Sequence, residues 1–217
     1  PEIALYMNDD QFVNGGITDE DPAIYAVLTD SSGINTIGRG IGHDILAILD
    51  GDINNSIVLN EYYTADLNSF RSGKVLYDLS QVSEGPHSLK LRAWDVYNNP
   101  GETTIDFVVA NSEDLALRHV LNYPNPFTSY TEFQFEHNRA NQPLQIRVQI
   151  FSASGQLVKS IQQELVPDGN RITGIAWDGR DDYGDPIGKG VYVYKLSMRS
   201  KTDGSQAEEY QKLVILR

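Results

Sequence analysis

The sequence predicts an all-β fold made of two consecutive Ig-like β-sandwich domains. Short runs of alternating apolar and polar residues, separated by Gly, Asn and Asp, recur along the whole chain. No apolar stripe of helical period reaches a useful length. With 217 residues the chain has room for two small domains, each with a workable core. We expect the domains to span residues 1–112 and 113–217, because the strand pattern gives way to polar residues near 111–114.

The first half contains seven strand-like runs, the number expected of one Ig-like sandwich. They lie at 3–7, 24–29, 45–49, 56–62, 74–79, 88–94 and 103–109. In the run 88–94, Leu89, Leu91 and Ala93 alternate on one face, so Trp94 marks a strand end or a bulge.

The second half repeats this pattern with runs at 132–136, 145–152, 157–165, 172–177, 191–198 and 210–216. Ser154 and Gly155 fit a tight hairpin turn between two of these strands. The last run is apolar at Leu213, Val214, Ile215 and Leu216 in succession. That pattern predicts a strand covered on both faces, either by its own domain or by a partner.

An unusual stretch, Leu-Asn-Tyr-Pro-Asn-Pro-Phe at 121–127, opens the second domain. Two prolines one residue apart remove two backbone donors and favour an extended run, either polyproline II or an edge strand. Tyr123 and Phe127 then act as apolar pegs on a stiff lead-in. On the residues alone, the stretch is a clamp at a strand entry.

Composition excludes several classes of function. The chain has no cysteine, and hence neither disulfides nor a cysteine nucleophile. Residues 1–110 carry 17 acidic and 5 basic side chains (−12), and residues 111–217 carry 13 and 12 (−1). The acidic first half disfavours nucleic acid and anionic membranes as partners. The sequence starts with Pro1 and shows neither a signal peptide nor a membrane-spanning run, so we expect a piece of a longer protein.

A set of spaced motifs resembles a known family. In the second half these are 121–127, Ile-Phe-Ser-Ala-Ser-Gly-Gln-Leu-Val at 150–158, Trp-Asp-Gly-Arg-Asp at 177–181 with Gly184, Gly-Lys-Gly-Val-Tyr-Val-Tyr at 188–194, and Lys-Leu-Val-Ile-Leu-Arg at 212–217. Together they resemble the C-terminal sorting domain of type IX secretion substrates, a β-sandwich similar to the Ig-like domain of the flagellar hook-capping protein. Stretches 32–35, 40–44, 59–63 and 93–99 resemble the region before that domain in PorU-type sortases, which are gingipain-related cysteine peptidases.

The resemblance implies a non-catalytic sorting and docking module. It would direct a secreted sortase or peptidase across the outer membrane to the cell surface and hold it on an outer-membrane β-barrel partner, with the catalytic Cys and His upstream. An extended terminal segment can add to an open sheet edge. The expected sorting and partner-binding residues are Tyr123, Pro124, Asn125, Pro126, Phe127, Lys212, Leu213, Val214, Ile215, Leu216 and Arg217. The expected turn motif is Trp177, Asp178, Gly179, Gly190 and Tyr192.

Two acidic clusters are candidate calcium sites. Asp178, Asp181, Asp182 and Asp185 place four carboxylates within eight residues, with Arg180 among them. Such a cluster serves either calcium or, as the resemblance to the hook-capping domain implies, a turn that follows an inward Trp177. The second cluster, 50–55, has the start of a calcium loop but lacks its glycine, and an Asx-rich hairpin turn is the other interpretation. No other cofactor is expected.

Two further hypotheses belong to other classes of function. An enzyme would use His43 and Asp44 as an oriented base, but no nucleophile accompanies them. A surface adhesin or carbohydrate-binding Ig-like pair would use Tyr62, Tyr63 and Tyr97 as a sugar platform. The glycines at 38, 40 and 42 suggest a phosphate loop only weakly, because the Gly-Lys-Ser/Thr ending is missing.

Overall fold

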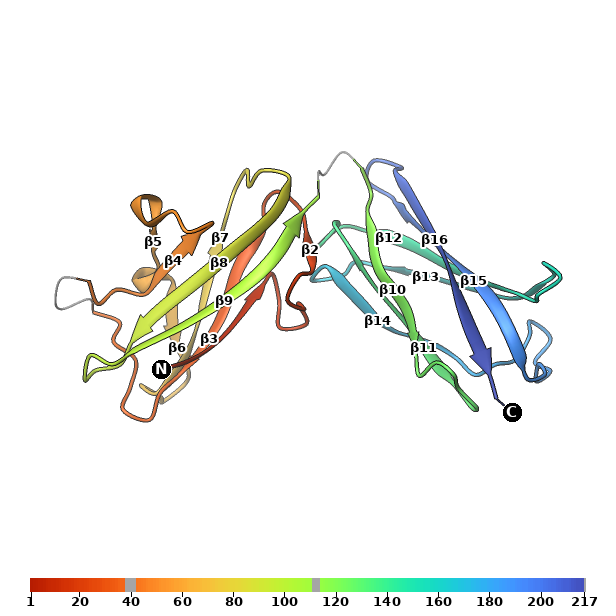
Figure 1. Ribbon diagram of the computed structural model, residues 1–217, viewed down its shortest axis with the longest axis horizontal. Coiled ribbons are helices and arrows are strands. Elements are labelled where there is room, and N and C mark those ends of the chain that lie inside the picture. The colour runs from red at the N-terminus through yellow and green to blue at the C-terminus, as the bar shows by residue number, and fades with distance from the viewer. Residues whose placement is uncertain (38–41, 111–113, 217) are drawn as a thin grey trace. The chain divides into compact units, whose positions relative to one another are not determined.

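The structure is a computed structural model that describes residues 1–37, 42–110 and 114–216. The chain forms two compact units, Pro1–Ala110 and Asn111–Arg217, each with its own hydrophobic core (Figure 1). The all-β prediction is confirmed, since the regular elements are strands apart from two short 3-10 turns. The expected boundary at 111–114 falls mainly on 111–113, outside the described residues.

The first unit consists of two sheets that face each other. One sheet has the strand order β1-β3-β7-β6, with β1 at Glu2–Met7, β3 at Ala23–Thr29, β7 at Ser72–Asp78 and β6 at Tyr63–Ala65. The other has the order β2-β9-β8-β4-β5, with β2 at Ile17–Thr18, β9 at Pro100–Val109, β8 at Gly85–Trp94, β4 at Leu46–Leu49 and β5 at Ile57–Val58. The 3-10 turns η1 and η2 cover Ile53–Asn55 and Asn60–Tyr62.

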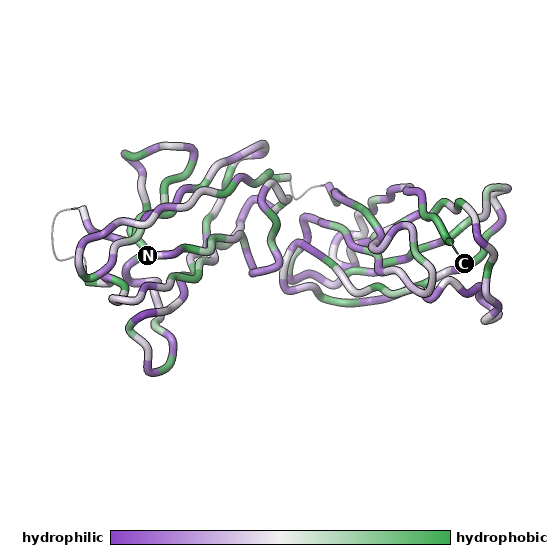
Figure 2. The backbone as a smooth tube through the Cα atoms, turned by 60° about the horizontal axis from the view of Figure 1, so that its bottom comes forward, coloured by the Kyte–Doolittle hydropathy of each residue, from purple (hydrophilic) through white to green (hydrophobic). Residues whose placement is uncertain are grey.

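Alternation along the strands builds the core of this unit. On β8, Leu89, Leu91 and Ala93 are fully buried, and the strand ends at Trp94, as the sequence predicts. They meet Ile24 and Leu28 of β3, which are also fully buried, from the opposite sheet. Apolar and polar stretches of chain succeed one another along both units (Figure 2). This burial of apolar surface is the main stabilising contribution to each sandwich.

The strand expected at 56–62 is wrong in most of its length. Only β5 is a strand there, and the chain then turns through η2. The side chain of Asn60 explains the turn, because its Oδ1 accepts from the Ile45 amide at 3.0 Å and its Nδ2 donates to the Thr36 carbonyl at 3.0 Å. A side chain that bonds backbone in this way competes with a strand ladder. The sequence also gave no signal for β2, which pairs in parallel with β9.

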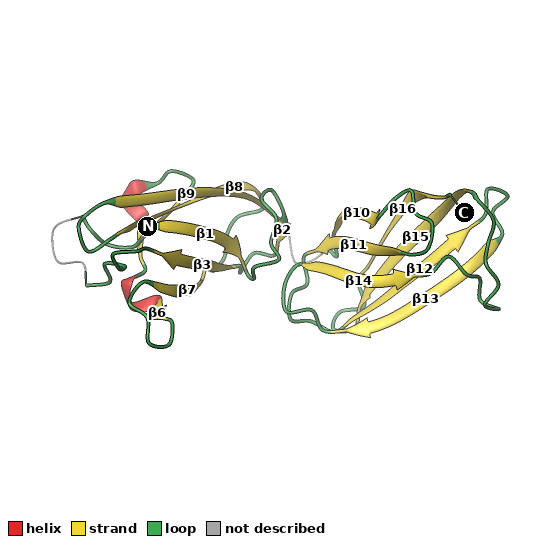
Figure 3. Ribbon diagram, turned by 90° about the horizontal axis from the view of Figure 1, so that it is seen from below, coloured by secondary structure: helices red, strands yellow, loops and turns green. Residues whose placement is uncertain are grey.

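The second unit is a sandwich of a three-stranded and a four-stranded sheet (Figure 3). The first has the order β10-β11-β14, with β10 at Leu117–Tyr123, β11 at Thr131–His137 and β14 at Arg171–Trp177. The second has the order β13-β12-β15-β16, with β13 at Leu157–Leu165, β12 at Leu144–Phe151, β15 at Gly190–Ser200 and β16 at Gln206–Ile215. Strand β10 was not expected, since its residues read as a mixed polar stretch.

The last strand does not have the double coverage that its apolar run predicts. Strand β16 is an edge strand, and it contributes Leu213 and Ile215 to the core. Val214 is half-buried on the other face, and Leu216 is 60% exposed. Only one face of the strand therefore packs into the core.

Within the described residues there is no helix with the length and apolar character needed to cross a membrane.

Candidate docking site at the last strand

The proline stretch bends instead of running extended. Strand β10 ends at Tyr123, and residues 124–126 form a bend in which the Tyr123–Pro124 and Asn125–Pro126 peptide bonds are both cis. The extended run expected through residues 124–126 is therefore wrong. Of the two expected pegs, Phe127 is buried, whereas Tyr123 is 69% exposed.

Asn125 and Phe127 bind the outer edge of β16. The Asn125 side chain donates from Nδ2 to the Lys212 carbonyl at 3.0 Å and accepts at Oδ1 from the Val214 amide at 3.0 Å. The Phe127 amide donates to the Val214 carbonyl at 3.0 Å, and its carbonyl accepts from the Leu216 amide at 2.9 Å. The side chain of Asn125 and the backbone of Phe127 thus make the hydrogen bonds that a neighbouring strand would otherwise make with this edge of β16. We call this contact the proline clamp, defined by Asn125 and Phe127 against residues 212–216.

The proline clamp unites the two segments that the sequence placed apart as docking elements. The clamp occupies outward backbone N–H and C=O groups of residues 212–216, which would otherwise be free to pair with a strand of another chain. Upstream on the same edge, the backbone groups of Gln206, Glu208 and Tyr210 have the same outward orientation by strand alternation. Among the described residues no other strand pairs with that stretch of β16 from outside. Arg217 lies outside the described residues.

Trp177 packs against Phe127 of the proline clamp. Trp177 is buried and its ring meets Phe127 edge-on, with centroids 5.7 Å apart and planes at 61°. Its indole Nε1 donates to the Arg180 carbonyl at 2.8 Å. Gly179 has φ of 70°, a left-handed conformation that favours glycine, so the turn needs this residue. The inward Trp and the turn after it agree with the sequence prediction.

The remaining two motif residues belong to β15. Gly190 begins that strand and pairs with Ile215 of β16. Tyr192 donates from its hydroxyl to the Gly188 carbonyl at 2.9 Å and packs against the core of the second unit. Both residues therefore hold the start of β15 against β16, which carries the clamped segment.

The acidic turn, residues 178–185, engages three of its four carboxylates within the chain, those of Asp178, Asp181 and Asp182. Asp181 accepts at Oδ1 from the amides of Tyr183 and Asp185, both at 2.9 Å. Asp182 accepts from the Ser160 amide at 3.3 Å, lies 3.3 Å from the Lys159 ammonium, and donates its own amide to the Val158 carbonyl at 3.2 Å. The turn thereby covers the beginning of the β13 edge, as the proline clamp covers the end of β16.

These contacts bear on the expected calcium site. Asp178 bonds the Arg180 amide at 3.1 Å and forms an ion pair with its side chain at 3.5 Å. Within the ranges that the structure describes, no group of three or more acidic or histidine side chains is placed to share a metal ion. Calcium at Asp178, Asp181, Asp182 and Asp185 stays a prediction, and the geometry favours the turn role.

The cluster at 50–55 is an Asx turn that also holds a histidine. Asp52 caps η1 by accepting from the Asn54 amide at 3.1 Å, and the pKa of its carboxyl is lowered first by a hydrogen bond from the Asn55 side chain at 2.7 Å and then by that from the Asn54 amide. Asp50 accepts from the Ser88 amide at 2.9 Å and lies 2.8 Å from Nδ1 of His87. The hairpin interpretation of this segment is the one that the contacts favour.

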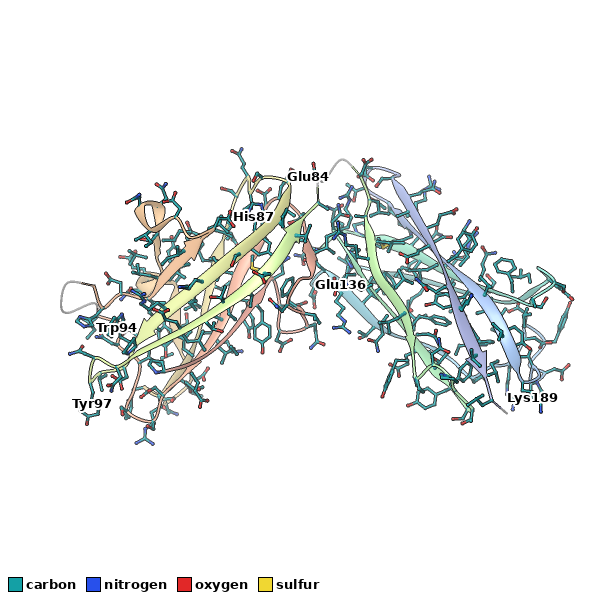
Figure 4. The ribbon with its side chains drawn as sticks, viewed as in Figure 1. Glu84, His87, Trp94, Tyr97, Glu136 and Lys189 are labelled. Carbon is teal, nitrogen blue, oxygen red and sulfur yellow. The ribbon has the colours of Figure 1, made fainter. Side chains whose placement is uncertain are left out.

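Sequence reasoning missed a grouping of Ser83, His87 and Asp50 that resembles a nucleophile, base and orienting carboxylate. Nε2 of His87 lies 3.5 Å from the Ser83 hydroxyl, and Nδ1 faces Asp50 (Figure 4 labels His87). The same Nε2 lies 2.7 Å from the Ser83 carbonyl, which can only accept, so this nitrogen carries a proton. It cannot also accept the proton of the serine, so the arrangement is structural.

The other candidate residues of the first unit do not assemble a site. His43 lies edge-on against Trp94, with ring centroids 4.5 Å apart, and the hydrogen bonds of the described residues link no nucleophile to it. Tyr63 packs against the core and Tyr62 against Tyr77, at a centroid distance of 4.7 Å. Tyr97, labelled in Figure 4, lies beyond the end of β8 and is 74% exposed. Because Tyr63 packs against the core, the three tyrosines do not all present exposed rings. The glycines at 38 and 40 lie outside the described residues.

A buried polar centre of the second unit also escaped the sequence analysis. His137, Asn138, Arg139 and Asn170 are buried beside one another in the hydrogen-bond network. Burial, with the Arg139 charge beside it, lowers the pKa of His137 to about 3. The sequence offers one sign of this centre, the polar run His137-Asn138-Arg139 after an apolar strand, and such a run is equally typical of an exposed turn.

Comparisons with known proteins extend these observations. Residues 124–204 match the FlgD Ig-like domain family, which confirms the Ig-like sandwich fold. The crystal structure of dimeric latent PorU from Porphyromonas gingivalis is 30% identical, with a TM-score of 0.50. That match covers 99% of this chain and 20% of the PorU chain. The chain is similar to PorU across both units. It spans about a fifth of the PorU chain's length.

Two further solved structures match at low sequence identity. The fibronectin(III)-like modules of CbhA from Clostridium thermocellum are 9% identical, with a TM-score of 0.36 over 99% of this chain and 93% of theirs. SGBP-B from Bacteroides ovatus, solved with a mixed-linkage heptasaccharide, is 13% identical, with a TM-score of 0.39 over 93% of this chain and 43% of its own. No curated protein sequence matches the chain. The likeness to PorU indicates a non-catalytic, Ig-like region of a secreted or cell-surface protein.

Proposed function

We propose that this chain is the sorting and docking module of a secreted, gingipain-related sortase. It directs the parent protein across the outer membrane by type IX secretion and holds it on an outer-membrane β-barrel partner. The observation that carries the proposal is the 30% identity to PorU along 99% of the chain, through both sandwiches. The catalytic Cys and His of the parent lie outside this chain, which has no cysteine.

The distribution of charge supports the second unit as the docking part. Residues 111–217 are nearly neutral, with 13 acidic and 12 basic side chains, whereas residues 1–110 carry a net charge of −12. A nearly neutral surface meets a membrane protein without the long-range repulsion that a strongly acidic one brings. Docking therefore uses the second unit, and the acidic first unit links it along the sequence to the catalytic part of the parent protein.

The proline clamp limits where along β16 a partner strand can add. Residues 212–216 are already paired with Asn125 and Phe127, so a partner strand cannot add there while the clamp is closed. The edge upstream, at Gln206, Glu208 and Tyr210, presents the outward backbone groups that strand addition requires. We place the docking contact at this upstream edge of β16.

The test follows the parent protein in cells of the source organism, by separating the outer-membrane fraction from the medium. Removal of residues 111–217 should release the parent into the medium or leave it unexported, while the intact protein stays in the membrane fraction. Removal of the last strand alone is a poorer test, because it takes Leu213 and Ile215 out of the core. Normal attachment after removal of 111–217 would contradict the proposed function.

A point variant tests the edge itself. Glu208→Pro removes an outward amide of an edge strand, where proline is tolerated, and should lower attachment. Glu208→Ala is the matched control, because it loses the same ion pair with Lys195 but keeps the amide. Equal attachment of both variants would rule out strand addition at this position and leave the broader docking proposal in place.

A further inference from the structure

The outer face of the four-stranded sheet carries a polar groove at the end where β15 leads into β16. The groove has a volume of about 160 Å³. Its polar lining consists of Gln145 and Arg147 from β12, Ser197 and Arg199 from β15, and Gln206 from β16. The residues that alternate with these along β12 and β15 are buried in the core. The groove therefore lies on the face of the sheet that the core does not use.

Strand register brings two arginines to this groove. Arg147 lies opposite Ser197, and Arg199 is two residues further along β15. The arginines are thus diagonal neighbours on one face, a position in which residues are about 7–8 Å apart and long side chains reach each other. The Ser197 hydroxyl lies on the same face beside both. Two guanidinium groups and a hydroxyl can therefore contact one small ligand in the groove.

The two arginines have no counter-ion of their own. Within the part of the chain that the structure describes, no ion pair or side-chain hydrogen bond involves Arg147 or Arg199. Both side chains are exposed. Like charges at neighbouring positions of a sheet are destabilising, and an anion placed between them relieves the repulsion.

The carboxylates around the groove are engaged elsewhere. Glu164 and Glu208 each stand opposite a groove residue, and each forms an ion pair with a lysine. Asp203, in the hairpin after β15, accepts from the amide and the hydroxyl of Ser205 and lies 3.4 Å from Nη2 of Arg139. The chain thus pairs its lysines here and leaves two positive charges in the groove uncompensated.

The donors of the groove suit a phosphate group. A phosphate monoester carries a charge of about −1.5 to −2 at pH 7 and three strong acceptor oxygens. Two guanidinium groups match this charge, and the planar fork of each can hold two oxygens at once. The Ser197 hydroxyl and the Gln206 amide add neutral donors. A carboxylate has one charge and two oxygens, so it uses fewer of these donors.

We propose that this groove binds the phosphate group of a phosphate monoester. Arg147 and Arg199 hold its oxygens from two strands, and Ser197 donates its hydroxyl between them. A free small ester and the head group of a phospholipid both offer this chemistry. The groove uses side chains on the face of the sheet, whereas the proposed docking contact uses backbone groups at the edge of β16. Phosphate binding therefore does not require the docking role.

The experiment titrates the full chain at pH 7 with glycerol 3-phosphate and with inorganic phosphate, and follows the arginine Nε–H and Ser197 amide signals by NMR. These signals should shift to saturation, with a dissociation constant of about 1 mM or tighter. Sodium acetate at the same ionic strength should bind at least about tenfold more weakly. Equal binding of acetate would contradict the phosphate assignment.

Point variants connect the binding to the groove. Arg147→Gln and Arg199→Gln should each raise the dissociation constant for phosphate at least about tenfold, because each loses a charged fork. Arg147→Lys keeps the charge without the fork and should bind with intermediate affinity. Arg118→Gln is the matched control, since Arg118 is an exposed arginine on β10 of the other sheet. It should bind phosphate as the unchanged chain does.

A thermal measurement separates binding from a structural role. Phosphate should raise the melting temperature of the unchanged chain, relative to sodium chloride of equal ionic strength, but not that of Arg147→Gln. Without phosphate, that variant should melt no lower than the unchanged chain, because it removes a repulsion and no contact. Circular dichroism verifies the fold of each variant.

Vesicles distinguish the two sources of the phosphate. Sedimentation of the chain with vesicles that contain phosphatidic acid, lost in Arg147→Gln, would assign the group to a lipid. Binding of glycerol 3-phosphate without sedimentation would assign it to a soluble ester. The proposal is overturned by no saturable binding to either probe, by unchanged binding in the Arg147→Gln and Arg199→Gln variants, or by an equal loss in Arg118→Gln.

Discussion

The proline clamp should contribute measurably to the stability of the second unit, and Asn125→Ala is the direct test. The substitution removes the hydrogen bonds to the Lys212 carbonyl and from the Val214 amide, and a third from Nδ2 to Oδ1 of Asn122 at 3.1 Å. Each such bond contributes about 0.5–1.5 kcal/mol net. Water can reach the first two, so we expect a total loss of about 1–2 kcal/mol in the free energy of unfolding, or roughly 5–10 °C in melting temperature.

Tryptophan fluorescence can follow the unfolding of the second unit by itself. The chain has two tryptophans, Trp94 in the first unit and Trp177 in the second, so a Trp94→Phe background leaves Trp177 as the reporter. Urea unfolding of this background is compared with and without Asn125→Ala. Gln206→Ala, at the exposed start of β16, is the control and should change the free energy of unfolding by less than about 0.5 kcal/mol.

Two further measurements decide whether the clamp acts as described. Hydrogen exchange of the Phe127 and Leu216 amides, which pair across the clamp, should accelerate in Asn125→Ala. Asn125→Asp keeps the acceptor for Val214 but turns a carboxylate oxygen toward the Lys212 carbonyl, and it should destabilise at least as much as alanine. Unchanged stability and exchange in Asn125→Ala would refute the clamp.

Other predictions concern the turn, the buried histidine and the excluded chemistries. Trp177→Phe should lower the free energy of unfolding by about 1–3 kcal/mol in urea denaturation followed by circular dichroism, because it leaves the Arg180 carbonyl without its donor. The folded chain keeps His137 neutral, with a pKa of about 3 against 6.5 when unfolded, so the unfolded state binds more protons between these values. Stability should therefore fall as the pH drops from about 6.5 toward about 3, by roughly 1 kcal/mol per pH unit, and His137→Gln should flatten that slope in urea titrations at a series of pH values. Calcium at millimolar concentration should leave the melting temperature unchanged in differential scanning calorimetry, because the turn already engages three of its four carboxylates; a clear rise would support the calcium prediction. A fluorophosphonate probe should not label Ser83, and labelling seen by mass spectrometry would contradict the structural interpretation of its contact with His87.

The local pattern of the sequence was enough for the fold class and for most strands. Leu89, Leu91 and Ala93 alternate with polar residues, and a residue placed this way in a strand reaches the core whatever its partners are. The inward ring of Trp177 and the turn at Asp178 and Gly179 were expected from the resemblance of the motif to the hook-capping domain, and the structure shows both. The absence of cysteine likewise needs no structure to exclude a cysteine nucleophile.

Contacts between distant residues could be known only from the tertiary structure. Asn125 and Val214 are 89 residues apart, and nothing in either local pattern shows that a side-chain amide would replace a strand at that edge. Strand β10 was missed because its polar residues pair with β11 across a turn that the prolines bend. Phe151 of β12 lies opposite Val193 of β15, and Val191 of β15 lies opposite Val214 of β16, through strand register, which the alternation within one strand does not determine. Local periodicity therefore decided which residues face inward, and strand pairing decided which outward residues became neighbours.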